Sequence, residues 1–224
     1  MFVNCLKSNR LFGCVVAALA AFLLFVPARG AEDETVGGRI EDNLRLMNND
    51  FSADREKGVM QVRNIDDVAL LASYGVIDRV WEILDNKNER DLVRVQCVKT
   101  LADLKKKGAL IRNMVPRFNK MLSMKTEQPR VRRAVAHIFS QIISPEKRDI
   151  EGQRVISTMA NILYDKEESA YIKKTVFKAL STFGIRSDKL LDVSMDVLKD
   201  PGSPLKQAAV DALYNIARTN HELT

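Results

Sequence analysis

The chain has 224 residues and a formal net charge of +6, and hydrophobic residues make up 46% of it. Half of that net charge comes from Lys7, Arg10 and Arg29, so the basic composition by itself does not indicate a nucleic-acid-binding protein. Of the three cysteines only Cys97 lies beyond residue 30, which excludes an intramolecular disulfide in the rest of the chain.

Residues 1–30 have the layout of a secretory signal peptide. They contain no acidic residue, begin with two cations and continue with an apolar run at 11–26. Small residues at the end of the segment predict cleavage between Gly30 and Ala31. We therefore expect an exported protein, located in the periplasm, outside the cell or in the lumen of the secretory pathway. The alternative is an uncleaved membrane anchor, although the run is shorter than the roughly 20 apolar residues that span a bilayer.

The rest of the chain divides into three parts. Residues 31–52 form a lead-in or partial repeat, residues 53–220 a helical repeat domain, and residues 221–224 a tail. After Ile40, apolar residues recur three and four positions apart almost everywhere, and glycine and proline are scarce. This periodicity predicts an all-helical chain, and no second domain is needed at this length.

Four segments of the helical region superpose on one another. Each begins with an apolar residue and a cation and continues with further apolar residues four, seven or eight positions on. They begin at Val93, Val131, Ile172 and Leu205. Their separations of 38, 41 and 33 residues are typical of repeats of two or three helices. A weaker copy at Ala53–Ile65 has Gly58 and Gln61 where the others are mostly apolar.

A second amphipathic segment precedes each of the four copies. These segments are Val76–Leu84, Met114–Leu122, Val155–Tyr164 and Leu190–Leu198. One such helix pair gains roughly 1.5–3 kcal/mol for each large side chain that it buries, whereas ordering its backbone costs about 1–2 kcal/mol per residue. A single pair is therefore unstable alone, and we expect stacked pairs that bury one another's apolar faces. A bundle of unrelated helices is the alternative, but it does not predict the self-similarity.

The repeated pattern resembles the armadillo/HEAT superfamily. The run Val93–Leu101 is similar to the second helix of a HEAT repeat, and Asp66–Ile77 is similar to the short first helix and glycine turn of an armadillo repeat. Lys107–Ile111, followed by Pro116, is similar again. The resemblance covers about Ala53–Asn220 and implies a right-handed α-solenoid of about four to five repeats. It indicates a scaffold rather than an activity, because one fold serves many functions.

Candidate catalytic and metal-binding residues are few. Cys97, His137 and His221 lie far apart in the sequence, without the spacing of a metal site. Cys97 takes the repeat position that Val or Ala fills in the other copies, which indicates a core residue rather than a nucleophile. The pairs Asp66–Asp67 and Glu167–Glu168 lie at expected helix starts or turns, where acids stabilise the helix dipole. We expect no catalytic residue, metal or cofactor. A HEAT-like lyase of the kind associated with pigment attachment is the enzymatic alternative, which export disfavours.

A cation follows the first residue of each copy, at Arg94, Arg132, Lys173 and Lys206. The family resemblance implies that this cation pairs with an acid in the turn between the helices, six positions earlier. Those positions hold Asn88, Thr126, Glu167 and Asp200. We therefore expect the pair in the last two copies only, and Arg94 and Arg132 need other partners or face solvent.

The resemblance also implies a binding surface. In armadillo proteins the last helix of each unit lines a concave groove, and residues four positions apart lie on one face of a helix. A first row of groove residues is Met60, Lys99, His137, Lys178 and Asp211. A second, polar row, suited to hydrogen bonds with a peptide backbone, is Asn64, Asp103, Gln141, Thr182 and Asn215.

Peptide-binding members of the family place tryptophan in the first row, and none occurs there in this chain. The single tryptophan, Trp81, belongs to an outer helix and is expected in the core. Binding by the groove edges or by one end of the stack therefore stays open.

These features together predict an exported adaptor or scaffold that binds a protein or peptide and neither nucleic acid nor, after cleavage, a membrane. One such protein would be a lumenal cofactor of a chaperone ATPase, because some of those cofactors resemble short armadillo arrays behind a signal peptide. A membrane-tethered scaffold, held by residues 11–26, is the alternative.

Overall fold

A computed structural model of the chain describes residues 29–143, 150–182 and 188–221. Within these ranges all of the regular secondary structure is helical and no strand occurs, as the periodicity predicts. Residues 1–28, which hold most of the expected signal peptide and the alternative anchor, lie outside the described part. None of the described helices is both long enough and apolar enough to cross a membrane.

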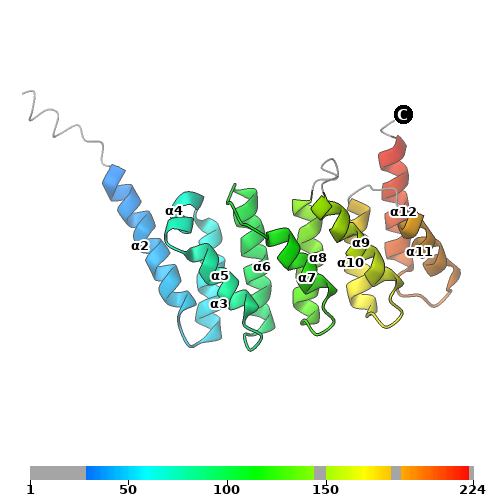
Figure 1. Cartoon of the computed structure of the whole chain (residues 1–224), viewed down its shortest axis with the longest axis horizontal. Helices are drawn as coiled ribbons and strands as arrows, with labels where there is room; N and C mark the ends of the chain where they lie inside the picture. The colour runs from blue at the N-terminus through cyan, green and yellow to red at the C-terminus, as the bar shows by residue number, and fades with distance from the viewer. Residues whose placement is uncertain (1–28, 144–149, 183–187, 222–224) are drawn as a thin grey trace, which may run out of the picture. The chain divides into compact units, whose positions relative to one another are not determined.

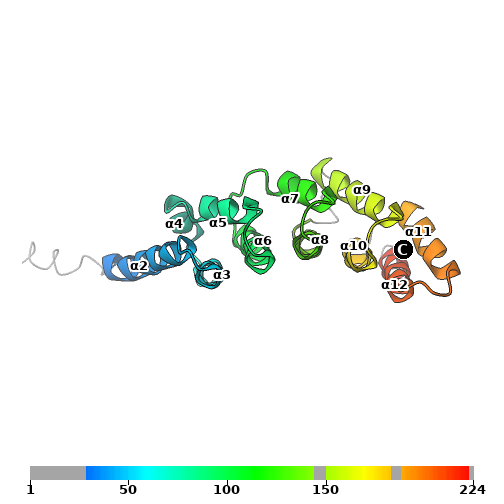
Figure 2. The same ribbon diagram turned by 90° about the horizontal axis from the view of Figure 1, so that it is seen from below.

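Helix α2 (Arg29–Met47) is followed by a unit, Asp42–Thr224, that contains the other helices. Those helices form two layers (Figures 1 and 2). The α6 layer consists of α3 (Ser52–Gln61, continued by the 3-10 turn η1, Val62–Asn64), α6 (Asp91–Lys106), α8 (Pro129–Ile142), α10 (Ala170–Thr182) and α12 (Lys206–His221). The α7 layer consists of α5 (Val76–Asp85), α7 (Met114–Ser123), α9 (Ile150–Tyr164) and α11 (Asp188–Lys199), with the short α4 (Val68–Ser73) before α5.

Helices of the α6 layer contact one another in chain order. Helix α3 packs against α6, α6 against α8, α8 against α10 and α10 against α12. The last four of these helices also contact a helix of the α7 layer: α5 packs on α6, α7 on α8, α9 on α10 and α11 on α12. The segments that superpose in sequence therefore lie side by side (Figure 1).

The turns before α5 and α7 are shaped by a helix cap and by left-handed residues. The Asp67 side chain caps α4 by accepting a hydrogen bond from the Leu70 N–H at 2.8 Å. Gly75, directly before α5, has φ = 71°, a left-handed conformation that glycine adopts without strain. Asn113 takes the equivalent place before α7 with φ = 56°. In that copy no short helix precedes the turn, so the similarity of Lys107–Ile111 is limited to the turn itself.

Aromatic side chains form the centre of the core between the two layers. Trp81 on α5 is only 6% exposed, as expected of a core tryptophan. Its ring lies 5.5 Å from that of Phe118 on α7, which in turn lies 6.3 Å from that of Phe139 on α8. Cys97 in α6 is also fully buried, and burial raises the pKa of its thiol to about 12. The thiol is therefore protonated at neutral pH, consistent with a core residue.

Arg94 and Arg132 are buried and join neighbouring repeats. Arg94 donates through Nε to the Leu84 carbonyl at 2.7 Å and through Nη1 and Nη2 to the Glu127 carboxylate at 2.6 and 2.9 Å. Arg132 donates in the same way to the Leu122 carbonyl at 2.9 Å and to Glu168 at 3.1 and 2.6 Å. The acidic partner of each arginine thus lies in the turn of the next helix pair, not in the turn of its own.

The two ion pairs expected in the last copies are not found. Within the described residues, neither Lys173 nor Lys206 has a carboxylate oxygen within 4.0 Å, and Glu167 pairs with Lys125 instead. The glutamates that pair with Arg94 and Arg132 stand four positions before the start of the following copy. In the last copy this position holds Pro201, which has no carboxylate. This ladder of arginine–glutamate pairs therefore stops before α12 for lack of an acceptor.

Gly58 is buried in α3 because the end of α2 passes close to it. A Cβ atom at this position would lie 2.8 Å from the Asn43 carbonyl oxygen and 2.9 Å from Met47 Cγ. A backbone oxygen cannot move aside as a side chain can, so Gly58→Ala should lower the free energy of unfolding by about 1–3 kcal/mol in urea melts. The matched change Gly38→Ala, where no atom lies within 4 Å, should raise it by up to about 1 kcal/mol. Stabilisation by both changes would contradict the close approach.

Candidate binding surface

The first row of expected groove residues is exposed on successive helices of the α6 layer. Met60 lies on α3, Lys99 on α6, His137 on α8, Lys178 on α10 and Asp211 on α12. The fold brings three of them together, because Lys99, His137 and Lys178 line one hollow. Lys178 and Asp211 share the next hollow, between α10 and α12, and Met60 lies apart from both.

The hollow shared by α6, α8 and α10 is about 640 Å³ in volume and strongly basic. We define its basic residues as the basic cluster: Lys99, Arg130, Arg133, His137, Lys174 and Lys178. Among the described residues no acidic side chain lines this hollow. Its remaining lining is apolar or hydroxyl-bearing and consists of Leu92, Val95, Ala134, Tyr171 and Thr175.

The positive charges of the basic cluster are only partly compensated within the chain. Arg130 pairs with Asp91 at 3.3 Å. Arg133 lies over the ring of Tyr171, 4.5 Å from its centroid, and donates to the tyrosine hydroxyl. By contrast, the three lysines of the cluster have no ion pair or hydrogen bond to any described side chain. Their charge is therefore available to an incoming anionic group.

The pKa of His137 is lowered by its surroundings in this hollow. Desolvation by its neighbours lowers the pKa of His137, and the charges of Lys178, Lys99, Lys106 and Arg133 lower it further. The Nε2 atom lies 2.9 Å from Nε2 of Gln141, one helical turn on. A histidine among four cations is neutral at neutral pH, because protonation would add a like charge to the group.

This arrangement predicts that the pKa of His137 depends on the charge of Lys178. Lys178→Glu replaces one of the cations with an anion, so the pKa of His137 should rise toward or above its ordinary value of about 6.5. An NMR titration of the imidazole protons measures it. Lys120→Glu on α7 makes the same change of charge in the other layer and should leave the His137 pKa unchanged. Equal shifts in both variants would contradict the placement of Lys178 beside His137.

The second row is already partly engaged within the chain. Asp103 lies 3.7 Å from Arg63 and 4.0 Å from Lys106, and Gln141 accepts a hydrogen bond from Lys106. The Thr182 hydroxyl donates to the Ala179 carbonyl of its own helix at 2.7 Å. Asn64 is exposed at the end of η1, and Asn215 is half-buried on α12. That this row bonds a peptide backbone stays a prediction.

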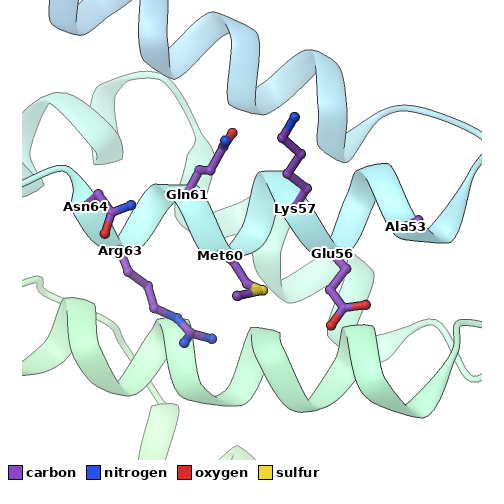
Figure 3. A pocket seen from close by; sticks show the side chains of 7 residues that line it. All are labelled: Ala53, Glu56, Lys57, Met60, Gln61, Arg63 and Asn64. Atoms are coloured by element: carbon purple, nitrogen blue, oxygen red, sulfur yellow. The ribbon is translucent and has the colours of Figure 1, made fainter.

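Met60 lines a shallow hollow made by α3 and η1 alone (Figure 3). Met60 and Arg63 point toward α6, while Lys57 and Gln61 point to the other side of α3 (Figure 3). Arg63 donates to the Thr100 hydroxyl at 2.8 Å and to the Gln96 carbonyl at 3.0 Å, so it ties η1 to α6. Charges of both signs line this hollow, which lacks the one-sided charge of the basic cluster.

Beyond α10, the charged residues that line the next hollow of the α6 layer are no longer all basic. The hollow between α10 and α12 includes Asp211, Gln207 and Tyr214, and the Asp211 carboxylate accepts a hydrogen bond from Gln207 at 2.8 Å. The concentration of positive charge therefore ends at Lys174 and Lys178, which lie on the α10 side of this hollow.

Sequence reasoning missed Arg130, Arg133, Lys174 and Tyr171. Arg133 and Lys174 lie four positions before His137 and Lys178, so the rule that defined the two rows would have found them one helical turn earlier. Tyr171 comes directly before the start of its copy, and no spacing rule marks it. Within the described part of the chain, no group of His, Cys, Asp and Glu could hold a metal ion.

No protein-family model matches the sequence, and no curated protein matches it significantly. Two solved structures of engineered proteins from the Northeast Structural Genomics Consortium are similar to the chain. The first is 15% identical, with a TM-score of 0.51, over 80% of this chain and 79% of that one. The second is 14% identical, with a TM-score of 0.50, over 80% of this chain and 48% of that one.

Human deoxyhypusine hydroxylase in complex with glycerol matches over 86% of this chain and 91% of its own, at 10% identity. Its TM-score of 0.35 does not indicate a shared fold. The likeness to the engineered proteins concerns the fold alone, since identities of this order do not carry function.

Proposed function

We propose that this chain is an exported armadillo/HEAT-type α-solenoid of about four to five repeats that serves as a protein-binding adaptor or scaffold. The repeated helix pairs and the arginine–glutamate contacts between neighbouring repeats support the solenoid. The layout of residues 1–30 supports export. A cofactor of a chaperone is one form that such an adaptor could take.

The observation that carries the proposal is the basic cluster. Three lysines from α6 and α10, without an ionic partner among the described residues, line the hollow to which α8 contributes His137. Like charges held close together are unfavourable in the free protein, and an anionic partner that covers them converts this repulsion into attraction. A rigid helical face also binds with little ordering cost of its own.

Affinity capture from the native compartment tests the proposal. The protein is compared with Lys99→Glu/Lys178→Glu, which reverses two charges of the basic cluster. Lys120→Glu/Arg154→Glu is the matched control, because it makes the same change of charge at exposed residues of α7 and α9. We expect the captured partner to be lost from the first variant and kept by the control. If every captured protein survives the first change, the proposed surface is wrong.

Measuring the mass of the native protein distinguishes the exported adaptor from the membrane-tethered scaffold. Loss of residues 1–30 supports the exported adaptor and excludes the membrane-tethered scaffold, whereas retention of the apolar run at 11–26 supports the tether.

A further inference from the structure

We infer that the segment bound by the basic cluster is an extended acidic stretch of polypeptide. Its carboxylates would meet Lys99 on α6 and Lys174 and Lys178 on α10, and an apolar side chain between them would meet Leu92 and Val95. This inference rests on the proposed function and names the chemistry of the partner.

Charge complementarity indicates that the bound segment is negatively charged. The hollow has no acid in its lining among the described residues, and the only acid paired with the basic cluster, Asp91, contacts Arg130 at its edge. Carboxylates are suited to this site because each lysine ammonium has three donors and no partner in the described chain. Desolvation lowers the pKa of His137, and the same excess of positive charge lowers it further.

The apolar part of the hollow favours a peptide. Leu92 is 38% exposed, and Val95 is half-buried one turn along the same helix. Burial of an apolar side chain against them would add hydrophobic stabilisation to the ion pairs. A sugar–phosphate chain or a sulfated polysaccharide has no comparable side chain.

Single-stranded nucleic acid is disfavoured for two reasons. Such ligands stack their bases on exposed aromatic rings, but the Arg133 guanidinium already occupies one face of Tyr171, the aromatic residue of this hollow. In addition, Asp211 stands in the next hollow, where a continuous phosphate backbone would be repelled. A peptide can place a neutral or basic residue there.

The spacing of the helices sets the length of the stretch. Packed helices lie roughly 8–10 Å apart, so the distance from α6 past α8 to α10 is about 20 Å. An extended chain advances about 3.3 Å per residue. The acidic stretch is therefore about six residues long, with acids near its two ends meeting Lys99 on α6 and the two lysines on α10.

Fluorescence anisotropy with the full-length chain tests the inference. The probe is a fluorescein-labelled peptide of about eight residues with glutamate at every third position and leucine between. We expect it to bind at least about tenfold more tightly than the same peptide with glutamine for glutamate. Lys99→Glu/Lys178→Glu should weaken binding by about tenfold or more, and Lys120→Glu/Arg154→Glu should leave it unchanged. Circular dichroism checks that both variants are folded.

Two outcomes would overturn the inference. One is equal affinity for the glutamate and glutamine peptides. The other is tighter, cluster-dependent binding of an oligo-dT of about eight nucleotides or of a heparin fragment, each measured in the same assay. The proposed function fails separately, when capture of the native partner does not depend on the basic cluster. Cluster-dependent capture without glutamate-peptide binding would refute the acidic occupant alone.

Discussion

Arg94→Met is expected to lower the free energy of unfolding by about 3–5 kcal/mol, the largest effect of any single change that we predict. The side chains of Arg94 and Glu127 are both 0% exposed, so the change leaves a buried carboxylate without the two hydrogen bonds from the Arg94 guanidinium, and only the half-exposed Lys87 remains as its cation. It also leaves the Leu84 carbonyl without its donor. Removing the buried partner of a buried charge costs far more than an exposed pair contributes.

Urea unfolding followed by the fluorescence of Trp81, the only tryptophan of the chain, measures this loss. The double change Arg94→Met/Glu127→Leu removes both charges and should recover much of the stability lost by the single change. Arg45→Met is the exposed control, because the Arg45–Asp42 pair is 82% and 68% exposed, and it should change stability by less than about 1 kcal/mol. A double variant as unstable as the sum of both single variants would show that packing, not charge, accounts for the loss.

Helix positions could be predicted from the sequence because burial of apolar surface decides them. The amphipathic segments correspond to α5, α7, α9 and α11, and the four superposed copies correspond to α6, α8, α10 and α12. The bounds differ where polar residues extend a helix: α9 begins at Ile150 rather than near Val155, and α12 continues to His221. Polar residues at the end of a helix do not show the apolar periodicity from which its bounds are predicted.

The arginine ladder could not be predicted by looking within one repeat. The partners of Arg94 and Arg132 lie 33 and 36 positions further along the chain, and only the stacking of neighbouring repeats brings them together. A signal was present, because glutamate stands four positions before three of the copies, at Glu89, Glu127 and Glu168. Arg55 and Glu89 form the first pair of the same kind.

The exposure of the first-row residues could be predicted from the sequence, but the one-sided charge of the hollow that three of them line could not. Lysines look alike in sequence, yet Lys107 pairs with Asp66 at 2.6 Å and Lys125 with Asp165 at 2.7 Å, whereas Lys99 and Lys178 have no such partner among the described residues. Which lysines remain uncompensated depends on residues more than thirty positions away, and these become neighbours only in the folded chain.

Acid should destabilise the fold through the same buried pair. Burial alone would raise the pKa of Glu127, but hydrogen bonds from Arg94, Lys87 and the backbone N–H of Gln128 outweigh it and hold the pKa at about 2, below the ordinary 4.5. The ionised form is thus favoured in the folded chain. Its contribution is complete above about pH 4.5 and is lost as the pH falls toward about 2, a difference of roughly 3 kcal/mol.

The pKa values of Glu89 and Glu168 are also lowered, since hydrogen bonds from Arg55 and Arg132 outweigh burial there, so these residues add to the loss in the same direction. Urea unfolding between pH 6 and pH 2 measures the whole effect. Glu127→Gln is less stable at pH 6 but has no carboxylate to protonate, so its stability should fall less steeply below pH 4.5. Parallel pH profiles for the two proteins would mean that protonation of Glu127 does not account for the loss of stability in acid.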